Sequence, residues 1–208
     1  MGEIPFIHPF AMLVCGPSQS GKSKFVLRLL ANASTMIQPR PQKICYYFNE
    51  YQPAFDRHPK INFCHGIPSQ TELEQMRDTV LIVDDSMQEI DENILNIFTW
   101  GSHHRNISII LILQNLFHKN RFLRTISLNA QYIIMMRNVR DATQIGLLAR
   151  QIYPQDAKFL TDAYIRSTRI PYGYLVIDLK TDQDDSLRVR TNIFPGDRQL
   201  VYVSRKHE

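Results

Sequence analysis

Short hydrophobic runs alternate with stretches that can form helices along most of the chain. The runs are bounded by glycine, proline or polar residues, as buried strands are. They cover residues 10–15, 43–48, 79–83, 107–113, 131–136 and 172–179. Residues 25–30 carry apolar side chains at helical spacing, and further stretches that suit helices lie at residues 70–77, 91–100, 122–128 and 142–152. This alternation predicts an α/β fold, with a mainly parallel sheet and helices on both faces.

The C-terminal part departs from this alternation. Residues 181–185 read Thr-Asp-Gln-Asp-Asp and predict a polar turn, and residues 187–194 predict a last strand. We expect this strand to pair with residues 172–179 as a C-terminal edge hairpin, and residues 195–208 to form a frayed tail. No internal repeat or domain linker is visible. We therefore expect a single domain over residues 1–208, with its core at about 10–194.

The composition fits this picture. Of the 208 residues, 44% are hydrophobic and 21% are charged, as in globular proteins with a sizeable core rather than in disordered chains. The longest apolar run, residues 107–113, is far shorter than the ~18 residues that a membrane-spanning helix needs. We expect no membrane partner and an intracellular protein that is not secreted. The three cysteines lack a C-x-x-C spacing, which predicts buried free thiols in a reducing compartment.

The loop after the first predicted strand carries the strongest chemical signal. Residues 16–23 read Gly-Pro-Ser-Gln-Ser-Gly-Lys-Ser, which satisfies the P-loop pattern G-x-x-x-x-G-K-[ST] between a strand and a helix. Its glycines let backbone N–H groups turn inward as an anion nest, and the helix adds its positive N-terminus. The predicted nucleotide-binding residues are Gly16, Pro17, Ser18, Gln19, Ser20, Gly21, Lys22, Ser23 and Lys24. Lys22 can reach the β- and γ-phosphates of ATP, and Ser23 can bind Mg²⁺. The alternative is a glycine-containing loop that matches the pattern by chance.

Two carboxylates follow the third hydrophobic run. Asp84 and Asp85 end the run Val-Leu-Ile-Val, which is typical of a Walker B strand. We expect Asp84 to hold Mg²⁺ together with Ser23, and Asp85 to polarise the attacking water. Aspartate is one methylene shorter than the glutamate found there in many ATPases, so Glu89 can assist. The alternative for Asp85 is an acidic cap on the next helix.

The fourth hydrophobic run is also followed by a polar residue, but here the residue is neutral. Gln114 follows residues 107–113, where it can report the state of the γ-phosphate if this strand lies between the Walker A and Walker B strands. Gln114 can instead satisfy a backbone group. We predict Gln114 as a sensor, and together with Lys22 and Asp85 as part of the catalytic set.

The charge is distributed unevenly. The net charge is +4, and residues 93–140 hold six Lys or Arg and three His but no acid, where the average density of 20 acids in 208 residues would give about five. Such a segment attracts a polyanion, or its bases face the triphosphate or a neighbouring subunit. Arg105 is our candidate arginine finger acting on a neighbour's γ-phosphate. The competing candidates are Arg121, Arg124, Arg137 and Arg140. His103 and His104 lack partners at zinc-ligand spacing and are expected to be loop residues.

Taken together, these motifs resemble those of the genome-packaging ATPases of the FtsK/HerA superfamily. The resemblance is nearest to those of Maverick/Polinton elements and adintovirus-like viruses, more distant to the poxvirus ATPases, and covers roughly residues 10–194. It rests on the segments GPSQSGKS, LIVDDS, GSHHRNISIILILQN, RTISLNAQYIIMMRN and PYGYLVIDL. One position departs from the pattern: many large-virus relatives have Gly-Arg-His before the sensor strand, and here Ser102 takes the place of that arginine.

The resemblance implies an ATP-driven motor that forms a ring of identical subunits and moves double-stranded DNA into a capsid. It implies ATP and Mg²⁺ as cofactors, sequence-independent binding of duplex DNA, and contact with a capsid or portal component. By position, Lys22 and Ser23 match the phosphate and Mg²⁺ residues, Asp84 and Asp85 the Walker B acids, and Gln114 the sensor. Three rivals stay open: a helicase or recombination motor of the same superfamily, a P-loop kinase, and a non-hydrolysing nucleotide switch.

Overall fold

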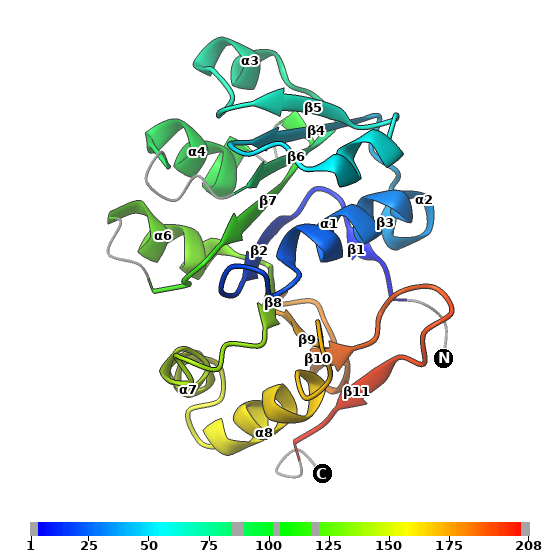
Figure 1. The fold of residues 1–208 in the computed structure, drawn as a ribbon. Helices are drawn as coiled ribbons and strands as arrows, with labels where there is room; N and C mark the ends of the chain where they lie inside the picture. Colours follow the sequence, from blue (N-terminus) through cyan, green and yellow to red (C-terminus); the bar gives the residue numbers. More distant parts are fainter. Residues whose placement is uncertain (1–3, 85–89, 102–104, 118–120, 205–208) are drawn as a thin grey trace.

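The structure, a computed structural model, describes residues 4–84, 90–101, 105–117 and 121–204. Within these ranges a nine-stranded sheet forms the centre of the molecule, in the order β11-β10-β9-β8-β2-β7-β6-β4-β5. Figure 1 shows the strands stacked in this order, from β5 at the top to β11 at the bottom. The strands are β2 (Ala11–Cys15), β4 (Lys43–Phe48), β5 (Asn62–His65), β6 (Thr79–Asp84), β7 (Ile107–Leu113), β8 (Tyr132–Met136), β9 (Tyr174–Asp178), β10 (Val189–Thr191) and β11 (Leu200–Tyr202).

The sheet is mainly parallel, as predicted. Neighbouring strands from β8 to β5 are parallel, whereas β9, β10 and β11 are each antiparallel to their neighbours. β7 lies between β2 and β6, which confirms the predicted additional strand between the Walker A and Walker B strands. Two short strands, β1 (Phe6–Ile7) and β3 (Ile37–Gln38), form a separate parallel pair.

Helices cover both faces of the sheet (Figure 1). Met12 and Val14 of β2 pack in one core with α1 and α2, whereas Leu13 and Cys15 pack in the other core with the remaining α-helices. Because both faces of the central strands are buried, their sequences are continuous apolar runs. The helices are α1 (Lys22–Ala31), α2 (Ala33–Met36), α3 (Gln70–Gln75), α4 (Glu92–Asn96), α6 (Arg121–Asn129), α7 (Thr143–Ile152) and α8 (Ala157–Ser167), with short turns of other helix types at η1 (Pro53–Arg57), η2 (Ile97–Gly101) and η3 (Asp185–Leu187).

The reversal of direction at β9 follows from α8, which the sequence analysis did not predict. A single helix after a strand returns the chain to the amino edge of a parallel sheet, so the next strand is parallel. Here α7 and α8 follow β8 in succession, and the second helix brings the chain back to the carboxyl edge. β9 therefore starts at the edge where β2, β6 and β7 end.

The C-terminal part differs from the expectation. β9 and β10 pair antiparallel as predicted, but the expected frayed tail was wrong, because residues 200–202 form β11 against β10. The added strand makes β11 the edge of the sheet. A fully buried ion pair joins the two predicted strands: Arg190 Nη2 lies 3.2 Å from Asp178 Oδ2. Burial raises the pKa of Asp178, and the Arg190 charge opposes that shift.

The cysteines are free thiols, but only one of the three is buried. Cys15 ends β2 in the core, whereas Cys45 and Cys64 are partly exposed. Burial raises the pKa of Cys15 to about 12, opposed by the positive charge of Lys22. The prediction of three buried thiols was therefore wrong for Cys45 and Cys64, because their strands lie toward the β5 edge of the sheet.

Candidate nucleotide-binding site

The loop between β2 and α1 has the backbone shape of an anion nest. Gly21, directly before α1, has φ 98°, and Gln19 has φ 63°, so both lie in the left-handed region. Gly16 is restricted by space, because a Cβ atom there would lie 2.6 Å from Cβ of Met136. The Ser20 hydroxyl is buried and has no hydrogen-bond partner within the described residues. A buried hydroxyl left without a partner fits a site that is completed by a phosphate oxygen.

Lys22 is held inside the curve of this loop. Only 8% of the residue is exposed, and its Nζ donates a hydrogen bond to the Pro17 carbonyl oxygen at 3.0 Å. Lys22 is the first residue of α1, whose first turn carries no acidic residue. The helix N-terminus and the ammonium therefore act together as a positive centre. This geometry suits the binding of β- and γ-phosphates.

Asp84 lies beside Lys22 and Ser23 at the end of β6. Its Oδ2 accepts a hydrogen bond from Ser23 Oγ at 2.9 Å and another from the Tyr46 hydroxyl at 2.5 Å. Asp84 is 6% exposed. Mg²⁺ in phosphate-transfer sites is held by one or two protein oxygens together with phosphate oxygens and water. The Ser23 hydroxyl and the Asp84 carboxylate are such donors, so they fit Mg²⁺, which would neutralise developing charge on the phosphates.

No other acidic or thiol cluster competes for a metal in the part of the chain that the structure describes. Groups of three or more His, Cys, Asp or Glu side chains with the geometry to hold an ion are absent from these residues. Asp85 and Glu89, the predicted water-polarising acids, lie outside the described residues. Their roles remain predictions.

Tyr46 is a site residue that the sequence analysis missed. It comes from β4, the strand next to β6, and its hydroxyl reaches the same carboxylate oxygen that Ser23 contacts. Burial and the negative charge of Asp84 raise the pKa of the Tyr46 hydroxyl, so it stays a protonated donor. The available signal was a tyrosine in a buried strand, since a buried tyrosine hydroxyl usually has a partner.

Tyr46→Phe is expected to destabilise the protein by about 1–2 kcal/mol, because the buried carboxylate of Asp84 loses one of its donors. The loss of the short hydrogen bond should also free Asp84 to move, which raises the Mg²⁺ concentration needed for half-maximal nucleotide binding. Denaturant unfolding and a Mg²⁺ titration measure the two effects. Tyr132→Phe is a suitable comparison, since Tyr132 is as fully buried as Tyr46 but its hydroxyl accepts a hydrogen bond from the Ile7 backbone N–H instead.

Gln114 is at the same edge of the sheet as the loop. Cys15 pairs with Leu113 in the register of β2 and β7, and the Gly16 N–H donates to the Leu113 carbonyl oxygen at 3.1 Å. Gln114, the next residue, therefore directly neighbours the start of the loop. The backbone of the predicted sensor strand and that of the P-loop are coupled by this hydrogen bond.

Arg105 lies at the amino-terminal end of the parallel strands, opposite the carboxyl-terminal end where the loop lies. It precedes β7, so the length of that strand, about 20 Å for seven residues, separates it from the loop. Its Nη1 donates to the Leu73 carbonyl oxygen at 2.9 Å. Arg105 thus cannot serve the site of its own chain, and any action on a γ-phosphate must be on another copy. Arg137 and Arg140 follow β8 at the loop's own edge and are exposed, as are Arg121 and Arg124 of α6.

The loop opens into a cleft of about 930 Å³. Asp84, Lys22 and Ser23 line its floor, residues that follow β4 line one side, and Tyr172 lines the other. Lys24 Nζ lies 4.9 Å from the centre of the Tyr172 ring. The volume is within the range of sites that bind small molecules, in which a few polar groups fix the orientation of the ligand.

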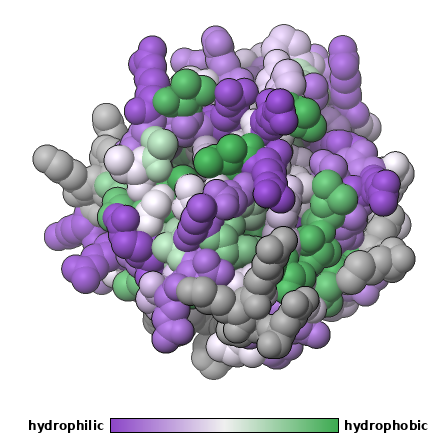
Figure 2. Space-filling model, turned by 90° about the horizontal axis from the view of Figure 1, so that it is seen from below, coloured by the Kyte–Doolittle hydropathy of each residue, from purple (hydrophilic) through white to green (hydrophobic). Residues whose placement is uncertain are grey.

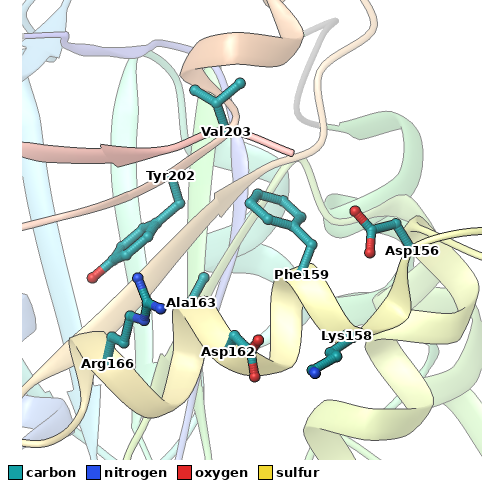
Figure 3. A pocket seen from close by; sticks show the side chains of 8 residues that line it. All are labelled: Asp156, Lys158, Phe159, Asp162, Ala163, Arg166, Tyr202 and Val203. Carbon is teal, nitrogen blue, oxygen red and sulfur yellow. The ribbon is translucent and has the colours of Figure 1, made fainter. Parts of the chain in front are cut away.

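Two further hollows lie away from the loop. One, of about 490 Å³, lies between α8 and β11, where Arg166 and Tyr202 lie beside one another (Figure 3). Its charged residues on α8 alternate in sign, so it does not select an anion. The other, of about 510 Å³, is lined by Arg40, Arg57, His58 and Lys60, and no acid lines it among the described residues.

The β2–β7–β6 strand order and the glycine-rich loop that leads into α1, with the Asp84 carboxylate beside the loop serine, give the chain the fold of a P-loop NTPase. Known structures agree. The genome packaging NTPase B204 from Sulfolobus turreted icosahedral virus 2, in complex with ATP-γS, has a TM-score of 0.53 and 15% identity, over 94% of this chain and 97% of that one. B204 from Sulfolobus turreted icosahedral virus, a DNA-packaging ATPase, has a TM-score of 0.56 and 12% identity, over 94% and 98%.

Comparison of the sequence with protein families and with curated proteins does not identify a family for the chain. No protein-family model and no curated protein matches the chain. Among the helices that the structure describes, none is long and apolar enough to cross a membrane.

Proposed function

We propose that the protein is a Mg²⁺-dependent ATPase that works as an oligomeric motor and moves double-stranded DNA into a viral capsid. The observation that carries the ATPase part is the contact of 2.9 Å between Ser23 Oγ and Asp84 Oδ2, beside the buried Lys22. Lys22 binds the β- and γ-phosphates, and Ser23 and Asp84 hold Mg²⁺, which stabilises the charge that develops on the transferred phosphoryl group. Asp85 orients and polarises the attacking water, and Gln114 senses the γ-phosphate.

The motor part is supported by the extent of the structural likeness. The packaging ATPases B204 match this chain over nearly the full length of both chains, so the likeness covers more than the nucleotide-binding core. The additional strand β7, with Gln114 at its end, suits a protein that passes the nucleotide state on to other parts of the assembly. It speaks against a P-loop kinase, which needs no such sensor.

A ring of identical subunits is consistent with the surface near the β11 edge of the sheet. Exposed large hydrophobic side chains on α7, α8 and β11 are Leu147, Ile165 and Leu200. From this side, hydrophobic patches lie among hydrophilic ones (Figure 2). Covering such side chains in a contact with another protein would remove apolar surface from water. In the proposed assembly they meet a second copy or a capsid or portal component inside the infected cell.

Duplex DNA is the polyanion that the acid-free segment suits best. Its exposed arginines Arg121, Arg124, Arg137 and Arg140 carry no ion pair within the described residues. They can neutralise phosphates without reading base edges, so binding should be independent of DNA sequence.

The test is ATP turnover with and without long duplex DNA. We expect DNA to raise turnover and to promote assembly into a species of higher mass, measured by light scattering in the same samples. Stimulation should be similar for unrelated DNA sequences and should fall steeply as salt is raised, since counterion release drives the binding. Turnover that DNA does not alter would contradict the motor, and strand separation of the duplex would favour the helicase alternative.

A further inference from the structure

The cleft beside the P-loop has two sides of different chemistry. Along the carboxyl edge of the sheet, the strands run in the order β6, β7, β2, β8, β9. Asp84 ends β6 and Gln114 follows β7, so both lie on one side of the loop that follows β2. Tyr172 precedes β9 and lies on the other side.

The order of the strands determines on which side of the loop the γ-phosphate and the nucleoside of a bound nucleotide lie. Lys22 and the Mg²⁺ donors attract the terminal phosphates, while the loop N–H groups hold the phosphates nearer the sugar. The γ-phosphate end therefore lies toward Asp84 and Gln114. The nucleoside leaves the loop on the side of Lys24 and Tyr172.

Tyr172 has the properties of a preformed aromatic platform. It is 59% exposed although it lines the cleft, and its backbone has φ 59°, which is unusual for a bulky residue. The next residue, Gly173, fixes the turn: its N–H donates to the Ile170 carbonyl oxygen at 3.0 Å, and a Cβ on it would lie 2.4 Å from the Ser167 carbonyl oxygen. Strained backbone that surrounding structure enforces is a recurrent feature of binding sites.

The ring is also held against the phosphate loop itself. A Cβ at Gly21 would lie 2.8 Å from Tyr172 Cδ1, so glycine at this position leaves room for the ring. Lys24 Nζ lies 4.9 Å from the ring centre, a cation–π distance. An aromatic ring that lines the cleft is thus placed beside the N–H groups of the loop, and most of the residue is exposed to solvent.

We propose that Tyr172 is the stacking platform for the base of the bound nucleoside triphosphate. The inference rests on the proposed nucleotide binding and names the part of the site that takes the base. Stacking on an aromatic face tolerates any base, so Tyr172 supplies affinity without strict base selection. It also supplies the base contact that no sequence motif predicted.

The experiment compares two ligands that differ in the nucleoside. Binding of the Mg²⁺ complexes of ATP and of inorganic tripolyphosphate is measured by calorimetry, without DNA, for the unchanged chain, Tyr172→Asn and Tyr172→Phe. Asparagine tolerates the left-handed backbone of this position, so the turn is kept while the ring is removed. Ile170→Asn is the matched control, because Ile170 lies in the same turn, is also 59% exposed and does not line the cleft.

We expect Tyr172→Asn to weaken ATP binding by about 5- to 150-fold, the range that loss of base–aromatic stacking gives. Tripolyphosphate binding should change less than about twofold, and Tyr172→Phe and Ile170→Asn should bind ATP as the unchanged chain does. Equal weakening of both ligands by Tyr172→Asn would overturn the proposal in favour of a role in shaping the loop. Unchanged ATP binding would overturn it outright. Failure of the unchanged chain to bind either ligand would instead contradict the proposed function on which the inference rests.

Discussion

Lys22→Ala is expected to reduce ATP turnover by a factor on the order of 10²–10³ or more, because it removes a preorganised positive charge from the phosphates. The buried ammonium donates to Pro17 and projects into the loop rather than into the hydrophobic core. The substitution should therefore leave the fold intact. Steady-state phosphate release measures the first effect, and thermal unfolding followed by circular dichroism measures the second.

The control for this substitution is Lys60→Ala. Lys60 is exposed and lines the basic hollow away from the P-loop, so the change removes the same charge elsewhere. It should leave turnover of ATP without DNA unaltered. If Lys22→Ala keeps its turnover while folded, the P-loop is not the catalytic phosphate site.

Arg105→Ala is expected to lower DNA-stimulated turnover by about 10³–10⁵-fold if Arg105 acts as an arginine finger on a neighbouring subunit. Its position at the opposite edge of the sheet excludes action within its own chain. A chain with Arg105→Ala keeps an intact loop and Asp84, and a chain with Asp84→Asn keeps its arginine. Mixing the two inactive variants should restore part of the turnover, because some interfaces then pair an intact arginine with an intact site.

The matched mixture uses Arg124→Ala in place of Arg105→Ala. Arg124 belongs to the same acid-free segment, lies on α6 and is exposed. Because Arg124 is also proposed to contact DNA, Arg124→Ala without a role at the interface should need more DNA for half-maximal stimulation but should keep the maximal turnover. Loss of activity by Arg124→Ala with recovery on mixing would assign the finger to Arg124. Absence of recovery in both mixtures would argue against catalysis across subunits.

The core strands could be predicted because burial on both faces leaves a continuous apolar run. The predicted range 107–113 coincides with β7, in which every residue is buried. The predicted range 43–48 coincides with β4, which is only partly buried but carries a run of apolar and aromatic residues. α8 was missed because a simple alternation of strands and helices has no place for two helices in succession. β5 and β11 were missed because strands near the sheet edges are half-exposed, so their hydrophobic pattern is weak.

The residues of the candidate site were also predictable only in part. The loop and Asp84 were predictable because one stretch of sequence carries each of them with its strand. Tyr46 and Tyr172 were not, because each reaches the site from an element remote in sequence, and the left-handed backbone of Tyr172 has no sequence signature. Arg105 could be found as a charge, but its place at the far edge follows from the direction of β7, which only the parallel pairing determines.

Because Cys15 is buried, the reactivity of its thiol can report on opening of the structure at the base of the phosphate loop. Its thiol is 1% exposed and directly precedes Gly16, and its pKa of about 12 keeps it protonated at neutral pH. Alkylation of this thiol therefore requires the hydrophobic core on that face of the sheet to open transiently at the end of β2. The rate of labelling at Cys15, relative to the partly exposed Cys45 and Cys64, measures how often the base of the phosphate loop opens. A ligand that closes the loop slows this one reaction, so its binding can be followed without a fluorescent nucleotide or an activity assay.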